Sequence, residues 1–257
     1  MCSIKSLLKT ILKSDLTDNE KFTIMQVAFE TRIALPGNSN TDLNYIIGDI
    51  EQMLKEDSFL DKSLTDAQKQ ALTNLLEQAY SRRMATAKSR DRIRYFDDKR
   101  YTLDVITKNT YLSDEQKANL IEQYYEKYIS VLYNTNNDID TNVKEYEKLL
   151  EEINSNEYLS KKQKENLLND VQDKLFSSIS AAIERAGNID KVKGYCQSIY
   201  KTYNKGLLTL DQADALYTKA QERVFVLDWN YIPSNVLVGT GYTSKYVHYV
   251  MLKAGKS

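Results

Sequence analysis

The feature that most constrains this chain is an internal repeat about 48 residues long. The segment that opens LSDEQK at Leu112 has four close copies elsewhere in the sequence. The leading leucines are Leu16, Leu64, Leu112, Leu159 and Leu208, separated by 48, 48, 47 and 49 residues. Self-similarity at a fixed period of this length is typical of repeat arrays, in which each unit packs on its neighbours. The fold is therefore expected to grow by the addition of similar units.

Each copy opens with the signature of a helix N-terminus. A Ser or Thr follows the leucine, and a Glu or Gln stands three residues later. These pairs are Thr17 and Glu20, Thr65 and Gln68, Ser113 and Gln116, Ser160 and Gln163, and Thr209 and Gln212. In such a capping box the hydroxyl accepts from the backbone N–H at N3, and the N3 side chain accepts from the backbone N–H of the cap. An apolar stripe at helical spacing follows, so each copy begins with a helix.

The sequence predicts an all-α fold built from five helical hairpins, either an α-solenoid or an extended helical bundle. An N-terminal capping helix is expected within residues 1–15 and the repeat body within 16–227. The expected units are 16–63, 64–111, 112–158, 159–207 and 208–227. Lys stands at N4 in four copies and offers the leading leucine no apolar partner, so that leucine should pack on a neighbouring unit. Eight Gly and two Pro are too few for a sandwich or barrel.

The helical pattern ends near residue 227. Residues 228–257 contain a proline and several glycines, and they are expected to form a docking arm of extended or mixed structure. The last part predicts either a short helix from Ser244 to Lys253 or one strand of a β-hairpin. An apolar, tyrosine-rich arm of this kind needs a partner. The candidate anchors are Trp229, Tyr231, Tyr242, Tyr246 and Tyr249.

Basic residues gather in the second unit. Six of the nine arginines fall between Arg82 and Arg100, where the local charge is +5 in a chain of net charge −1. Arginine is suited to planar recognition of phosphate and carboxylate groups. The cluster predicts either contact with an anionic partner, protein or nucleic acid, or a solvated helix junction with intrahelical ion pairs. The candidate patch is Arg82, Arg83, Lys88, Arg90, Arg92, Arg94, Lys99 and Arg100.

Residue usage argues against catalysis and against a metal or cofactor site. The single histidine, His248, has no nearby nucleophile with an acidic orienter. Cys2 and Cys196 form no disulfide framework or metal-ligand pattern, and Cys196 falls in an apolar series typical of a core residue. No run approaches the roughly 18 apolar residues of a membrane helix, and residues 1–13 are too short and too polar for a secretory signal. A non-enzymatic protein without a small-molecule substrate, cofactor or membrane contact is expected.

Tyrosines are concentrated in the third unit, where Tyr124, Tyr125, Tyr128 and Tyr133 lie on or beside the expected first helix. Such rings could form a stacking platform for nucleic-acid bases. Core and interface packing is the favoured interpretation, because the rings recur at helical spacing and their hydroxyls can reach the surface.

Two function classes remain for a protein of this kind. One is a structural component of a large symmetric assembly, and the other is a cellular α-helical repeat adaptor that binds a protein or peptide. The chain holds 26 Lys, 19 Asn and 19 Tyr, a usage typical of an AT-rich genome. With its helical body, its arginine cluster and its C-terminal arm, it resembles the ring or head-to-tail adaptor (connector) proteins of tailed bacteriophages, nearest those of the crAss-like group.

This resemblance implies a virion protein that forms a homo-oligomeric ring below the portal. The C-terminal arm would dock into the neighbouring ring, and the partners would be portal or tail ring proteins. The cluster from Arg82 to Arg100 would make electrostatic contact with DNA or with an acidic partner surface. The adaptor hypothesis implies a cytoplasmic protein instead.

Overall fold

The structure is a computed structural model that describes residues 10–11, 13–59, 62–97, 100–132 and 139–229. The described residues form helices with two short β-hairpins, which confirms the all-α class. They divide into two compact units, one of residues up to 132 together with 157–160, and one of residues 139–156 together with 161–229. None of the helices in these ranges is long and apolar enough to cross a membrane.

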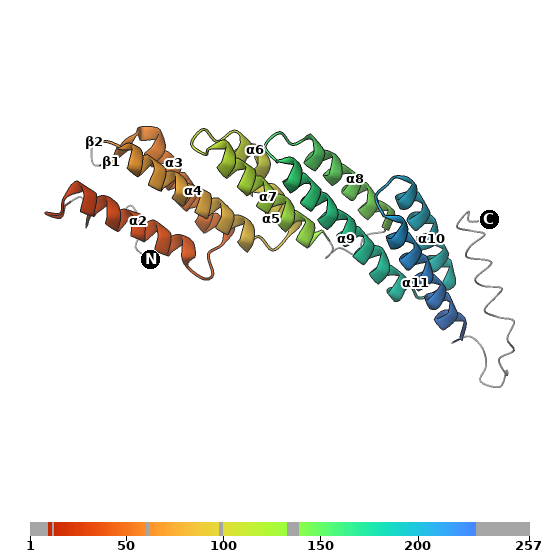
Figure 1. The fold of residues 1–257 in the computed structure, drawn as a ribbon. Coiled ribbons are helices and arrows are strands. Elements are labelled where there is room, and N and C mark those ends of the chain that lie inside the picture. The colour runs from red at the N-terminus through yellow and green to blue at the C-terminus, as the bar shows by residue number, and fades with distance from the viewer. Residues whose placement is uncertain (1–9, 12, 60–61, 98–99, 133–138, 230–257) are drawn as a thin grey trace. The chain divides into compact units, whose positions relative to one another are not determined.

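The first unit holds most of the elements labelled in Figure 1. Its helices are α2 (Asp18–Ala34), α3 (Asn40–Glu56), α4 (Asp66–Thr86), α5 (Arg90–Arg94), α6 (Thr102–Thr107) and α7 (Asp114–Val131). Strand β1 (Ser58–Phe59) pairs with β2 (Lys62–Ser63), and β3 (Tyr95–Asp97) pairs with β4 (Arg100–Tyr101), both antiparallel. The second unit holds α8 (Ile139–Ser155), α9 (Lys161–Arg185), α10 (Ile189–Asn204) and α11 (Leu210–Trp229).

Five of these helices, here called box helices, begin at the predicted capping boxes: α2, α4, α7, α9 and α11. Thr17, Thr65 and Ser113 each make both bonds of the box. Thr209 and Gln212 exchange the same two bonds, at 3.0 and 3.2 Å. Helix α9 begins directly after Ser160. The five predicted helix starts are therefore confirmed.

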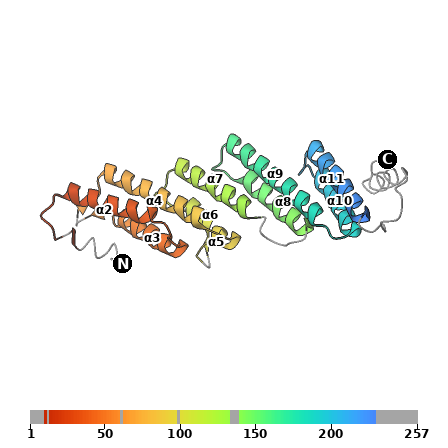
Figure 2. The same ribbon diagram turned by 90° about the horizontal axis from the view of Figure 1, so that it is seen from below.

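Within each unit, the box helices form one layer and the other helices form a second layer beside it (Figure 2). The helices of the second layer pack mainly on the box helix that follows them: α3 on α4, α5 and α6 on α7, α8 on α9, and α10 on α11. A simple hairpin would instead pair each of them with the box helix before it. The leading leucines of copies two to five are buried. This agrees with the expectation from lysine at N4 for Leu64, Leu112 and Leu159, whereas Leu16 is exposed although Lys21 stands at its N4 position. Leu208 is buried in a copy that has Ala213 at N4.

The second copy departs from the repeat. Copies one, three and four each contain an unbroken helix of 16 or 17 residues after the box helix, namely α3, α8 and α10. In copy two the same stretch is divided into α5, the β3–β4 hairpin and α6. The corresponding part of the fifth copy lies beyond Trp229, outside the described residues. The described part of the chain therefore does not confirm a regular array of five hairpins.

The predicted ends of the chain are only partly described. Helix α11 runs to Trp229, two residues into the predicted arm, and Tyr231, Tyr242, Tyr246 and Tyr249 lie outside the described residues. Of the predicted capping helix, Ile11 is described and buried, and Ser14 Oγ donates to its carbonyl oxygen at 2.7 Å.

The first capping box predicts a lowered pKa for the Glu20 carboxyl group, which can be measured. The side-chain hydrogen bond from Thr17, followed by the bond from its backbone N–H, lowers the pKa of Glu20 from its usual value. Because the folded-state pKa is lowered, the stabilisation is present above the unfolded-state pKa and is lost as pH falls through the folded-state pKa. We expect NMR titration to show a pKa of Glu20 lower than that of an ordinary glutamate, and Thr17→Val to raise it. An unchanged Glu20 pKa in Thr17→Val would contradict this assignment.

Candidate interaction site

The broken helix of copy two is built around a buried arginine. Arg83 on α4 is only 1% exposed. Its Nη2 donates to the carbonyl oxygens of Tyr95 and Phe96, both at 2.6 Å, and its guanidinium lies 4.5 Å from the centre of the Phe96 ring. A buried cation is tolerated only where its donors are satisfied. Arg83 therefore fixes the start of the β3–β4 hairpin against α4.

Two asparagines one turn apart on α3 hold the same segment from the other side. Asn44 Nδ2 donates to the carbonyl oxygen of Phe96 at 2.8 Å, and its Oδ1 accepts from Arg83 Nε at 2.8 Å. Asn40 Nδ2 donates to the carbonyl oxygen of Arg92 at 3.3 Å. Residues four apart on a helix share one face. Helix α3 thus provides hydrogen bonds that an unbroken helix in copy two would not need.

The held segment presents arginine and tyrosine side chains together. We call Arg92, Arg94, Tyr95, Arg100 and Tyr101 the Tyr–Arg surface. The rings of Tyr95 and Tyr101 lie opposite each other across the two strands, with centres 5.0 Å apart. The Arg94 guanidinium lies 5.6 Å from the Tyr101 ring centre, within cation–π range. Tyr101 is 46% exposed, and Arg92 and Arg100 are exposed as well.

The Tyr101 and Tyr95 phenols interact with each other. The side-chain hydrogen bond with Tyr101, followed by the charge of that phenol, raises the pKa of Tyr95. The Tyr95 phenol is therefore neutral at physiological pH. Neutral phenols beside arginines can donate to and accept from a partner without adding charge.

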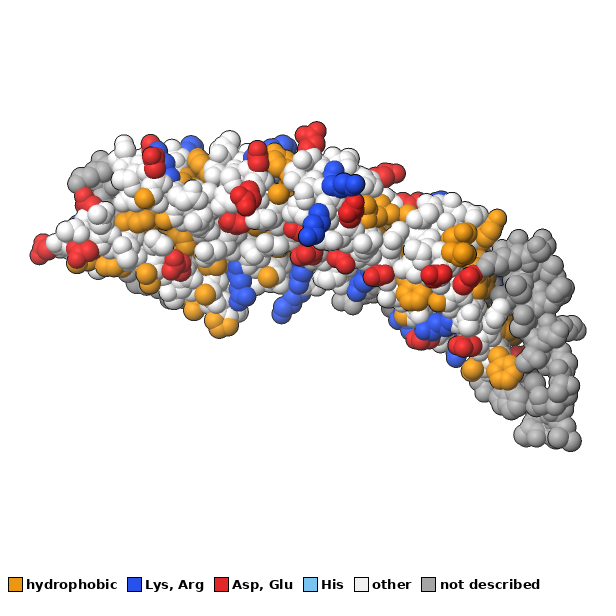
Figure 3. Space-filling model, in the orientation of Figure 1, with side chains coloured by type: hydrophobic (Ala, Val, Ile, Leu, Met, Phe, Trp, Pro, Cys, Tyr) orange, Lys and Arg blue, Asp and Glu red, His pale blue; other side chains and the backbone are white. Residues whose placement is uncertain are grey.

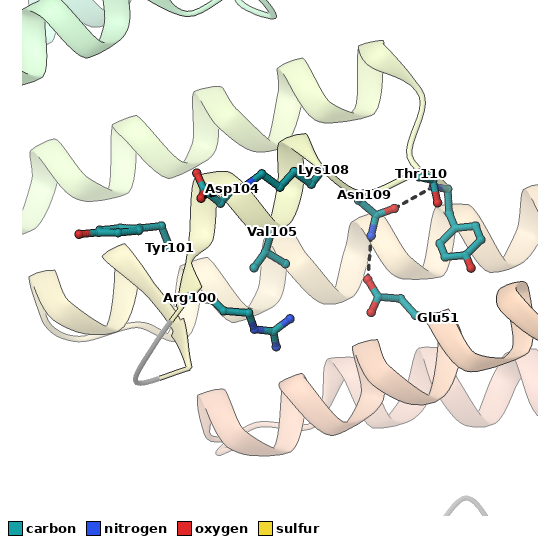
Figure 4. Close-up of a pocket in the computed structure, with 9 residues that line it drawn as sticks. Glu51, Arg100, Tyr101, Asp104, Val105, Lys108, Asn109 and Thr110 are labelled. Atoms are coloured by element: carbon teal, nitrogen blue, oxygen red, sulfur yellow. Dashed lines mark hydrogen bonds and ion pairs between the residues drawn. The ribbon is translucent and has the colours of Figure 1, made fainter.

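An open pocket of about 430 Å³ adjoins this surface beside α6 (Figure 4). The Glu51 carboxylate, from α3, accepts from Asn109 Nδ2 at 2.7 Å and from the Tyr80 hydroxyl at 3.0 Å. Asp104 pairs with Lys108 at 3.1 Å. The pocket holds these two acids together with Arg100 and Lys108, so its charges balance and it does not select a small anion.

A second open pocket, of about 490 Å³, lies at the N-terminus of α3. Its lining includes Asn40, Asn44, Arg83, Arg92 and Tyr95. The two asparagines and Arg83 are those that hold the hairpin, so their polar groups are already engaged there. We therefore interpret this hollow as a consequence of the broken helix, with Arg92 and Tyr95 at its rim.

The structure separates the predicted anionic-partner patch into three groups. Lys88, Arg92 and Arg100 are exposed, and Arg82 and Arg94 are half-buried. The side chains of Arg90 and Lys99 are outside the described part of the chain. Arg83 was wrongly placed in a contact patch, because it is buried and its donors bind the backbone of the chain itself.

Two other predictions concern the core. Tyr124 and Tyr125 are buried, with ring centres 5.2 Å apart in an edge-to-face arrangement, which confirms packing over base stacking for these two rings. Cys196 is buried too, and burial raises the pKa of its thiol to about 11. A thiol of such high pKa is mostly protonated and unreactive at neutral pH.

Sequence reasoning missed the residues that hold the broken helix. Asn40 and Asn44 lie 52 residues away from the carbonyl groups that they bind. Thr102 is buried, and its hydroxyl donates to the carbonyl oxygen of Ile93 at 2.6 Å. The one signal in the sequence was Arg83 itself, which stands at the end of an apolar stripe and so was a candidate for burial.

Comparison with known proteins gives one match. Residues 62–88 match the family model of the GA module, a protein-binding domain. The matched residues span β2, the capping box at Thr65 and the whole of α4, and they end two residues before α5. No curated protein and no solved structure matches the chain. A protein-interaction role is compatible with this match.

Proposed function

We propose that this chain is a non-enzymatic structural protein of a large symmetric assembly and that it binds a partner protein through the Tyr–Arg surface. The observation that carries the proposal is the break in copy two. There the helix that is unbroken in copies one, three and four is interrupted, Arg83 is buried, and Tyr101 and Arg92 are exposed to solvent. Departures from a repeat that weaken its regular packing are expected where a surface is used.

The chemistry of the Tyr–Arg surface suits an acidic protein partner. Tyrosine and arginine dominate the energetic centres of protein interfaces. The two tyrosine rings and Arg94 are held against one another before binding, which reduces the entropy lost on association. The GA-module match ends at Lys88, shortly before this surface, and a protein-binding domain at that place supports a protein partner over nucleic acid.

The finer proposal is a virion ring or head-to-tail connector protein of a tailed bacteriophage. It is supported by the helical body, by the basic surface and by the tyrosine-rich arm that the sequence predicts for residues 228–257. On this proposal copies of the chain form a ring, the arm docks neighbouring subunits, and portal or tail ring proteins contact the Tyr–Arg surface. Any contact of that surface with DNA would be electrostatic.

Charge reversal at two exposed arginines tests this proposal. The site variant combines Arg92→Glu with Arg100→Glu in the full chain. The control combines Lys191→Glu with Lys201→Glu, two exposed lysines of α10, and changes the net charge equally. Affinity purification with quantitative mass spectrometry should recover the same partner proteins with wild type and control, and at least about tenfold less of them with the site variant, because like charges then meet across the interface.

Three other results would contradict the proposal or favour a different partner. Equal recovery with the site variant would contradict binding through the Tyr–Arg surface. Weaker binding of duplex DNA to the site variant, with an unchanged set of proteins, would assign the surface to nucleic acid. A strictly monomeric full chain that binds a short peptide would favour the cellular adaptor.

A further inference from the structure

Helix α2 exposes two positions that every other box helix buries, and a third that the next box helix, α4, buries. Leu16 is 37% exposed, whereas the four other leading leucines are 3–5% exposed. Ile24 is 39% exposed, whereas its counterparts Leu72, Leu120, Leu167 and Leu216 are at most 1% exposed. Val27 is 52% exposed, and its counterpart in the next copy, Leu75, is 1% exposed. We call Leu16, Ile24 and Val27 the leading face of α2.

In later copies, this face is covered in part by the preceding box helix. Helix α4 packs on α2, α7 packs on α4, and α11 packs on α9. We call each such contact a joint. Side-chain bonds cross two of the joints at the same separation of 39 residues: Gln116 Nε2 donates to Glu77 Oε2 at 3.0 Å, and Gln212 Nε2 donates to Asp173 Oδ1 at 3.2 Å. The N3 glutamine thus caps its own helix and binds the helix before it.

The first copy differs at the residues that make these joints. It carries Glu20 in place of the N3 glutamine, so it presents an acceptor where α7 and α11 present a donor. It also carries Val27 where α11 carries Lys219, whose Nζ donates to Ser180 Oγ at 2.6 Å across the α9–α11 joint. A helix that occupied the leading face of α2 would therefore have to offer apolar side chains and a donor for Glu20.

Helix α11, the last box helix, offers this chemistry. Counted from the cap residue, Gln221 and Glu222 stand at the positions of Glu77 and Asp173, and Gln221 supplies the amide donor. One turn later Phe225 and Val226 are 48% and 44% exposed. Trp229 stands at the position of Ser180, the partner of Lys219. At the α9–α11 joint these two positions hold Lys219 and Ser180, whereas in the first and last box helices they hold Val27 and Trp229.

We infer that copies of this chain join end to end, with α2 of one copy packing on α11 of another as α4 packs on α2. Exposed hydrophobic side chains gather over α2 at the left of the space-filling view (Figure 3). Such a contact joins two different faces, so it extends beyond a dimer into a ring or a filament. This inference rests on the proposed assembly function and names the surfaces that build the assembly.

Two variants of the full chain test the inference, one at each end. Val27→Lys changes only the leading face of α2, and lysine at this position is tolerated in α11. Val226→Lys changes only α11. Sedimentation across a concentration series should show association beyond the dimer for wild type, and at least about a hundredfold weaker association for each variant, because each buries an unpaired charge. Asn119→Lys, an exposed position of α7, should behave as wild type.

The decisive experiment mixes the two variants. The Val27→Lys chain keeps a functional α11, and the Val226→Lys chain keeps a functional leading face, so an equimolar mixture should form a 1:1 complex that grows no further, because lysine meets lysine at the second contact. Wild type that stays monomeric overturns the inference. The inference is also overturned if Val27→Lys associates as strongly as wild type, because assembly then uses another surface. In that case the partner-recovery experiment would still test whether the Tyr–Arg surface binds a partner protein. A stability loss in Val27→Lys without weaker association would show that the chain's own residues cover α2.

Discussion

Replacing Arg83 by methionine lowers the free energy of unfolding by about 3–5 kcal/mol. Methionine fills much of the same space but leaves the carbonyl oxygen of Tyr95 and the Oδ1 atom of Asn44 without their donor. It also removes one of the two donors to the Phe96 carbonyl oxygen, which keeps only its bond from Asn44. Each buried acceptor that loses its partner costs about 1–3 kcal/mol. Arg83→Lys should recover only part of the loss, because one ammonium cannot span three acceptors that a planar guanidinium reaches.

Chemical denaturation followed by helical circular dichroism measures this effect. The matched control is Arg82→Met, one residue earlier on α4, where the side chain is half-buried and its Nε atom has no hydrogen-bond partner. We expect the control to change the free energy of unfolding by less than about 1 kcal/mol. A similar, small effect of both substitutions would show that Arg83 does not hold the broken helix.

Changing Gln116 to glutamate lowers the free energy of unfolding by about 2 kcal/mol. Glutamate preserves the capping box, as Glu20 does in the first copy. It replaces the donor to Glu77 by a second carboxylate at a buried position, so a charge-assisted bond is lost and like charges meet. Because this repulsion raises the pKa of one carboxyl group in the folded state, the cost should shrink as pH falls through that raised pKa.

Two further variants isolate the joint from the cap. Gln68→Glu introduces the same change at a box whose glutamine makes no bond to another helix among the described residues, and it should cost less than about 0.5 kcal/mol. Combining Gln116→Glu with Glu77→Gln reverses donor and acceptor and should restore most of the stability. A double variant no more stable than Gln116→Glu alone would contradict a direct bond between these two side chains.

The sequence predicted the local features of this fold because their causes are local. A capping box needs only the cap and N3 residues, three positions apart, so Thr17, Thr65, Ser113 and Thr209 could be assigned without knowledge of tertiary structure. Lysine at N4 removes the local partner of Leu64, Leu112 and Leu159, and these leucines are buried, but Leu16 has the same lysine and is exposed. The capping-box prediction does not depend on which helices become neighbours, whereas the burial of a leading leucine does.

The features that the sequence did not predict depend on such neighbours. The choice of α4 over α2 as the main partner of α3 is a matter of packing between helices, and the repeat pattern is the same for either choice. The use of Gln116 and Gln212 across the joints could not be read from the boxes alone, since their partners lie 39 residues earlier.

The candidate site shows the same limit. The arginine cluster located the Tyr–Arg surface, but composition could not separate Arg83, which binds backbone carbonyls in the core, from Arg92 and Arg100, which reach solvent. Arg83 differs from the exposed arginines in its hydrogen bond to Asn44, which lies 39 residues earlier in the sequence. A charge count treats all these arginines alike, whereas burial divides them into structural and exposed groups.

The measurement that tests the central claim most directly is a reconstruction, with side chains resolved, of the assembly that contains this chain. The account predicts that Arg92, Arg100 and Tyr101 are buried against an acidic surface of another protein. It also predicts that Arg83 still binds the carbonyl groups of Tyr95 and Phe96. A reconstruction in which the Tyr–Arg surface faces solvent, while other surfaces of the chain make the contacts, would contradict the account.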